Sequence, residues 1–166
     1  PIIIQRLKEP YTVFTKFHLA SLGILTKIVM LDPGLGAFIA PSDLSLIILH
    51  MINNFPNHSF MFTGIERFLR AAFKIPEIAT VLVPTVLPVC MKAAKERKYI
   101  TLTAFSMRIV DIVKRFCFQE PFLREIVAHI PGFRQFVSRE LAQYIEILKN
   151  DYGGDSTGMQ ATPVAI

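Results

Sequence analysis

The chain lacks tryptophan, has only two cysteines among its 166 residues and is poor in charge. Charged side chains make up 19% of the sequence and hydrophobic ones 52%, whereas globular proteins are usually about one-quarter charged. A disordered chain needs the opposite balance, so this composition excludes that class. Two cysteines cannot form a disulfide framework, and we expect Cys90 and Cys117 to be small buried side chains in a reducing compartment.

The motifs of phosphate, metal and nucleophilic chemistry are also missing. Gly34 and Gly36 lie in the segment Asp-Pro-Gly-Leu-Gly, which lacks the third glycine and the preceding strand of a dinucleotide-binding loop. No His-Glu-x-x-His or paired-cysteine motif supplies zinc ligands. We therefore predict a protein that is not an enzyme, with no catalytic residues, no metal and no cofactor.

Long apolar runs are missing as well. The longest strongly apolar run without charge is residues 78–91, which includes Pro84 and Pro88, and a membrane-spanning helix needs about twenty such residues. We expect a buried layer of helices instead of a membrane span. The sequence opens at Pro1 without the basic segment or cleavage site of a signal peptide. We expect a cytoplasmic or nuclear protein, and the opening favours a piece of something larger.

What the sequence does contain is apolar side chains at helical spacing. Apolar residues recur three and four positions apart, and no stretch alternates as a strand does. Pro84 and Pro88 predict a kink or a break near Val83, because proline removes a backbone hydrogen bond inside a helix. The expected helices cover residues 13–31, 41–52, 59–73, 76–98, 101–118, 120–130 and 133–148.

The spacing of the turns suggests how these helices are arranged. Turns recur about every two helices, or roughly forty residues, which is the loose period of a HEAT or armadillo repeat. We therefore predict an all-α fold, a right-handed alpha-solenoid of HEAT/armadillo-like helical hairpins with about seven helices. This domain would cover residues 1–150 as part of a longer solenoid, and 151–166 would form a flexible C-terminal tail. A globular helix bundle is the alternative.

The net charge is +5, and part of the excess is local. Lys92, Lys95, Arg97 and Lys98 follow one another near the end of a predicted helix, where they would line one edge of the protein. Ordinary solvated helix ends are the alternative interpretation. Nucleic acid is an unfavourable partner, because the chain has no tryptophan and its 14 phenylalanines and four tyrosines lie mainly on apolar faces.

The four histidines stand apart in the sequence. We expect His18 and His50 to be hydrogen-bonded core or interface residues, His58 to be a turn or cap residue, and His129 to lie at the carbonyl end of a helix. An apolar pocket around Cys90 and one of these histidines would indicate a different class, a helical bundle that binds a small apolar ligand.

Four segments carry a resemblance to a known family. They are Thr15-Lys16-Phe17-His18-Leu19 with Leu22 and Leu25, Leu46 to Leu49 leading through Phe55-Pro56-Asn57 to Phe60-Met61, Lys98-Tyr99-Ile100 before a long helix, and Phe133-Arg134-Gln135-Phe136-Val137 with Leu141. In this order they resemble the later part of the SAPS domain, the helical domain of the serine/threonine protein phosphatase 6 regulatory subunits. The resemblance covers residues 1–150 in pattern more than in identity. The chain departs from the family at His58-Ser59, Phe62, Thr101-Leu102 and Phe133.

The resemblance implies a non-catalytic scaffold that holds a serine/threonine phosphatase catalytic subunit and directs it to substrates. The turn from Phe55 to Phe60 and the helix of His18 would then face the partner, with Asn57 buried in the turn and bonded to backbone groups or, alternatively, capping the next helix. An unrelated HEAT/armadillo adaptor and a membrane-surface protein with a basic edge are the alternatives. The predicted partner-binding residues are His18, Phe55, Asn57, His58, Phe60, Lys95, Arg97 and Lys98.

Overall fold

A computed structural model describes residues 2–9, 11–32, 34 and 41–151 of the chain. These residues form helices and turns and contain no strand, so the all-α prediction is confirmed. The tail expected at 151–166 lies outside the described residues, apart from Asp151, which ends the last helix. The helices are α1 (Ile2–Lys8), α2 (Lys16–Leu31), α4 (Pro41–Asn54), α5 (Ser59–Ala72), α6 (Pro76–Glu96), α7 (Ile100–Gln119), α8 (Pro121–Ala128), α9 (Phe133–Phe136) and α10 (Ala142–Asp151).

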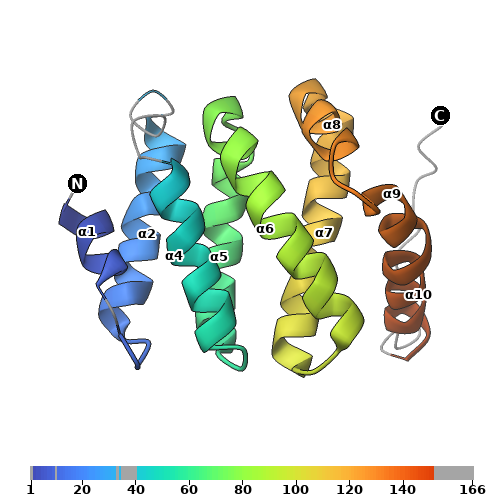
Figure 1. The fold of residues 1–166 in the computed structure, drawn as a ribbon, viewed down its shortest axis with the longest axis horizontal. Coiled ribbons are helices and arrows are strands. Elements are labelled where there is room, and N and C mark those ends of the chain that lie inside the picture. Colours follow the sequence, from blue (N-terminus) through green and yellow to red (C-terminus); the bar gives the residue numbers. More distant parts are fainter. Residues whose placement is uncertain (1, 10, 33, 35–40, 152–166) are drawn as a thin grey trace, which may run out of the picture.

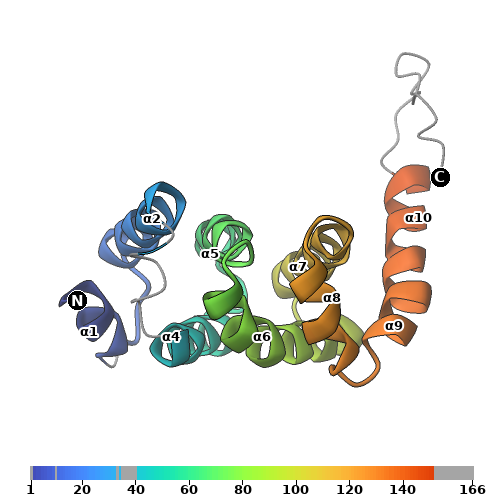
Figure 2. The same cartoon turned by 90° about the horizontal axis from the view of Figure 1, so that it is seen from above.

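The helices are arranged in two rows. Figure 2 shows α1, α4 and α6 in one row and α2, α5 and α7 in the other. Neighbours within a row pack together, and α6 also packs against α7 and α8. Consecutive helices therefore form pairs, each pair contributing one helix to each row. At the far end α10 follows α9 through a π-helical turn (Val137–Leu141), and it stands beyond α7 and α8 (Figures 1 and 2).

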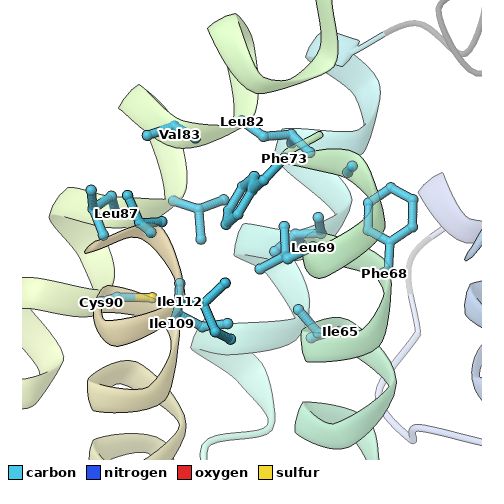
Figure 3. Packing of buried hydrophobic residues seen from close by; sticks show 14 of the residues in the cluster. Ile65, Phe68, Leu69, Phe73, Leu82, Val83, Leu87, Cys90, Ile109 and Ile112 are labelled. Atoms are coloured by element: carbon cyan, nitrogen blue, oxygen red, sulfur yellow. The ribbon is translucent and has the colours of Figure 1, made fainter. Parts of the chain in front are cut away.

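The core lies between the two rows. Buried apolar side chains of α5, α6 and α7 meet there, among them Leu69, Leu87 and Ile109 (Figure 3). Phe62 of α5 stacks on Phe105 of α7 with ring centroids 4.4 Å apart, and both side chains are fully buried. These contacts join neighbouring helices of the same row, so burial of apolar surface holds the pairs side by side.

One glycine sets the close approach of α2 to α5. A Cβ atom added at Gly64 would lie 2.9 Å from Leu19 Cδ1 and 3.4 Å from Leu22 Cδ1. The missing side chain therefore lets leucines of α2 press against the backbone of α5. This contact is next to the start of both helices, and it fixes the spacing of the ends that carry the candidate site.

Of the kink or break expected near Val83, the break is wrong, because α6 continues through Pro84 and Pro88. Both prolines lie on the exposed side of the helix, four residues apart, where water can bond to the carbonyl groups that their rings leave free. Val83 and Leu87, on the opposite side, are buried in the core and hold the helix there. Burial of one face therefore compensates for the lost hydrogen bonds of the other.

Among the described residues, one helix is long and apolar enough to cross a membrane by length and composition. It is α6, with a mean hydropathy of 1.5 over its most apolar stretch, and half of that stretch is buried inside the protein. Core helices with this degree of burial meet the same criterion, so the observation is weak evidence for a membrane span.

Other boundaries and faces also differ from expectation. Helix α1 was not predicted, and α2 begins at Lys16 after the N-cap Thr15, three residues later than the apolar pattern suggested. Phe60, a predicted partner-binding residue, is 74% exposed, whereas Met61 and Phe62 next to it are fully buried. The predicted helix 133–148 is divided into α9 and α10, which are joined by a π-helical turn at Val137–Leu141.

Two carboxylates on α5 and α7, Glu66 and Asp111, are partly covered and paired. Glu66 lies 2.9 Å from Arg70 on its own helix and 3.1 Å from Arg108 of α7, with 17% of its side chain exposed. Asp111 pairs with Arg115 one turn later. The ion pair between Glu66 and Arg108 connects α5 to α7.

Candidate functional site

The turns that join paired helices all lie at one end of the molecule. The α1–α2, α4–α5 and α6–α7 connections are at the lower end in Figure 1. We call residues 11–15, 55–58 and 97–99 the turn edge. The predicted partner-binding residues belong to this edge or to the helix turns beside it, on three separate helix pairs: His18, Phe55, Asn57, His58, Phe60, Lys95, Arg97 and Lys98.

An aromatic–histidine cluster occupies the turn edge where the first two helix pairs meet. Tyr11 lies at its centre, with ring centroids 4.0 Å from His18 of α2 and 4.9 Å from His50 of α4. The Tyr11 ring is also parallel to that of Phe55, 5.7 Å away. The cluster thus joins one turn to two helices and to the next turn. Its members are Tyr11, Phe14, His18, His50, Phe55 and His58.

Two histidines of the cluster cap helices. His18 Nδ1 accepts a hydrogen bond from the Thr15 backbone N–H at 2.9 Å, so this histidine takes the place of the glutamate in a capping box. His58 is the N-cap of α5, and its Nδ1 accepts from the Met61 N–H at 3.2 Å. The Phe14 ring lies 5.4 Å from His18 and 4.8 Å from His58. Phe14 therefore connects the starts of α2 and α5.

The interior of the cluster is apolar enough to disfavour charge. Burial raises the pKa of Tyr11 to about 12 and lowers the pKa of His18. Within the described part of the chain, neither the Tyr11 hydroxyl nor His50 Nε2 has a hydrogen-bond partner, and both atoms are buried. The other nitrogen of His50, Nδ1, lies 3.0 Å from the side-chain nitrogen of Asn54. The rings of Tyr11 and His50 are therefore held mainly by ring contacts and burial.

A groove opens beside the cluster, between the ends of α4 and α6. Its volume is about 450 Å³, within the range of ligand-binding clefts. Ile52, Pro56, Val89 and Leu102 supply apolar surface to its walls. Lys92, Glu96, Lys98 and Tyr99 also line it, so the groove combines an apolar floor with charged groups.

The cations at the end of α6 are largely without carboxylate partners. Lys92 lies 3.7 Å from Glu96, whereas Lys95 and Lys98 form no ion pair with any residue that the structure describes. The Lys95 ammonium lies 5.8 Å from the Phe136 ring centroid, and that of Lys98 lies 5.2 Å from the Tyr99 ring centroid. Arg97 also lacks an ion pair in the described ranges, and as C-cap of α6 it has a left-handed backbone with φ of 50°.

The structure places the predicted site residues in two groups. His18, Phe55 and His58 meet in the cluster, and Lys98 lines the groove. Arg97 precedes Lys98 in the chain, and Lys95 lines a separate cavity with Pro88 and Pro131. Asn57 is exposed, and no side-chain hydrogen bond joins it to the described residues, so the expectation of a buried or capping asparagine is wrong and His58 caps α5 instead. Phe60 projects from α5 into solvent and is 74% exposed.

Sequence reasoning missed three members of the cluster, Tyr11, Phe14 and His50. A signal was present for two of them. Tyr11 and Phe14 are three residues apart, and both precede Thr15, the N-cap of α2. Aromatic side chains at such positions often pack against the first turn of the helix that follows. His50 had no comparable signal, since its contact with Tyr11 joins residues far apart in the sequence.

The described residues also show which metal-binding and nucleophilic groups are present. No group of three or more histidine, cysteine or acidic residues in the ranges described could hold a metal ion. Cys90 is fully buried next to Ser106, and burial raises the pKa of its thiol to about 12. It lies in the core between α6 and α7 (Figure 3). A thiol in that state is a packing group, because the thiolate is the reactive form.

The site therefore offers aromatic, imidazole and cationic side chains on a surface built from three turns. Comparison of the chain with protein-family models, with curated proteins and with solved structures finds no match.

Proposed function

We propose that this chain is a non-catalytic scaffold that binds a protein partner along the turn edge. In this proposal the helix pairs are repeats of a right-handed HEAT/armadillo-like alpha-solenoid, a fold class that presents extended binding surfaces. The stacking of consecutive pairs in two rows supports that interpretation. Free cysteines in the described chain agree with a cytoplasmic or nuclear location, where thiols stay reduced.

One observation carries the proposal: α2, α5 and α7, the helices of one row, each have an exposed apolar side chain at their start. Phe17 of α2, Phe60 of α5 and Ile100 of α7 are 50%, 74% and 87% exposed, and each belongs to the first turn of its helix at the turn edge. We call these three residues the apolar row. Neighbouring packed helices are about 8–10 Å apart, so the row presents apolar groups at regular intervals.

An exposed, regular set of large apolar side chains favours a protein surface as partner. Apolar patches of this kind on a soluble domain mark interaction sites, and aromatic residues are enriched at the centres of interfaces. None of the three is buried against the core, although the half-exposed Phe17 ring also contacts His18 edge-on, with ring centroids 5.7 Å apart. The partner would cover the apolar row together with the cluster and the groove.

The sharpest form of the proposal names a serine/threonine phosphatase catalytic subunit as the partner. It is supported by the resemblance of the segments around His18, Phe55 and Phe133 to the SAPS domain. An unrelated adaptor with the same fold would use the same surface for a different protein. The two forms differ only in which partner binds.

The test uses matched triple variants and a purified phosphatase 6 catalytic subunit. Phe17→Ser/Phe60→Ser/Ile100→Ser removes the apolar row, and Met30→Ser/Leu31→Ser/Phe118→Ser removes three exposed apolar residues at the opposite ends of α2 and α7. Size-exclusion chromatography with light scattering should show a complex with wild type and the second variant, and none with the first. Absence of a complex with wild type would reject the phosphatase form, and equal complexes with both variants would reject the surface.

A further inference from the structure

The groove between α4 and α6 has the features of a peptide site. Val89 and Leu102 supply its accessible apolar surface, with Pro56, above the buried Ile52. Side chains at this junction belong to two helix pairs, so an occupant would contact both pairs at once. The groove reaches the turn edge, where Pro56, Lys98 and Tyr99 line it.

The charge beside this groove is strongly one-sided. Lys92 and Lys98 line it and Arg97 precedes Lys98, against the single carboxylate of Glu96, whereas Lys95 lines a separate cavity near Phe136. Glu96 is 3.7 Å from Lys92, which leaves Arg97 and Lys98 without an ion pair among the described residues. Cations at the end of a helix complement the helix dipole, but that role needs no more than one or two of them. The surplus is free to bind an anionic group.

The backbone at Arg97 adds a second, independent observation. A left-handed C-cap normally selects glycine, because a side chain is strained there. At this position the chain has an exposed arginine between Glu96 and Lys98, which both line the groove. Strained residues of this kind are concentrated at functional sites, where the side chain itself is required.

We infer that the groove binds an acidic peptide segment, in which Asp or Glu side chains alternate with large apolar ones. The apolar side chains would enter the groove while the carboxylates meet Lys92, Lys98 and Arg97. This inference rests on the proposed function and specifies the chemistry of the partner's contacting segment. Charge complementarity of this kind sets specificity and association rate.

The experiment selects displayed random dodecamer peptides on the immobilised full chain. The selected peptides should be rich in Asp and Glu together with Leu, Ile or Phe. A synthetic, fluorescein-labelled copy of the most enriched peptide should bind wild type with an affinity that falls as salt rises from about 0.05 M to about 0.3 M, since exposed charge pairs are screened. Neutral or basic selected peptides, or none at all, would overturn the inference.

Charge-reversal variants locate the site. Lys92→Glu/Lys98→Glu should weaken binding of the labelled peptide about tenfold or more, because two attractive contacts become repulsive. The matched control is Lys27→Glu on the exposed side of α2, outside the groove, which should change binding less than twofold. Circular dichroism must show that all variants remain folded. Equal binding by wild type and the double variant would refute the groove.

The outcome is separable from that of the proposed function. If the double variant still forms the full complex and the apolar-row variant does not, the scaffold proposal stands and the groove inference fails. If both variants form the complex, the proposed surface itself is wrong.

Discussion

Acidification should destabilise this protein through the histidine that caps α2. In the folded chain His18 Nδ1 accepts the Thr15 N–H at 2.9 Å, which only a ring with an unprotonated Nδ1 can do. Protonation would remove this bond and place a positive charge at a helix N-terminus. Loss of an N-terminal cap costs about 1 kcal/mol, and the unfavourable dipole interaction adds about 0.3–1 kcal/mol. The expected loss is therefore about 1–2 kcal/mol of unfolding free energy.

The direction with pH follows from the pKa of His18. Burial lowers this pKa in the folded state, so the folded protein favours the neutral ring, while the unfolded chain takes up a proton near the ordinary value of about 6.5. The contribution is complete above about pH 6.5 and is lost as pH falls below it toward the folded pKa. The other charged or titratable groups that line the cavity beside His18 are Arg6, Glu9 and Tyr11.

The assay is urea unfolding at about pH 7.5 and about pH 5, for wild type and His18→Gln. Glutamine keeps an acceptor for the Thr15 N–H, as in an ordinary capping box, but does not titrate. All other groups are shared, so the difference between the two proteins isolates His18. Wild type should lose about 1–2 kcal/mol more than the variant between the two pH values. Equal losses would refute the argument.

Three further predictions concern single residues. Arg97→Gly should raise the free energy of unfolding by about 1 kcal/mol, because glycine accepts the left-handed C-cap, yet weaken binding of the acidic peptide; a destabilised variant would contradict the strain argument. Phe62→Ala should cost about 3–5 kcal/mol in urea unfolding through loss of the buried stack on Phe105, while Phe60→Ala should change it by less than about 0.5 kcal/mol, and similar losses would mean that Phe60 packs in the core. Cys90 should resist iodoacetamide in the native protein and react on unfolding, as followed by mass spectrometry, since burial raises its pKa to about 12; rapid native labelling would show an open core.

Local patterns were sufficient to predict the helices after α1. The spacing of Ile65, Phe68, Leu69 and Ala72 predicted the buried face of α5, and all four are fully buried. Pro76 at the start of α6 and the pause at 97–100 were placed within a few residues. Such features depend on neighbours in the sequence, so a periodic pattern is enough to find them.

Faces and interruptions depended on tertiary packing. Phe60 and Met61 are both large and apolar, but Met61 is spaced four and seven residues from Ile65 and Phe68 and is buried, whereas Phe60 is exposed. The effect of Pro84 and Pro88 depended on which side of α6 faces solvent, and this follows from the neighbours of α6. A short helix such as α1 is stabilised mainly by packing on α2 and α4, which the sequence of α1 does not reveal.

The candidate site was predictable in part. The residues around Phe55 and His58 were singled out, and they lie in one cluster with His18. The centre of that cluster, Tyr11, was missed because its contacts reach from one turn to α4 and to the next turn. The groove could not be predicted from the sequence either, because Ile52, Lys92 and Leu102 come from three separate helices.

The central claim, that the turn edge binds a protein partner, is tested most directly by quantitative affinity purification from the cell extract of origin. The tagged wild type is compared with the apolar-row variant and with the variant at the opposite helix ends, and retained proteins are measured by mass spectrometry. We expect one stoichiometric partner with wild type and with the opposite-end variant, and its loss with the apolar-row variant. Retention of the same partner by all three proteins would contradict the claim.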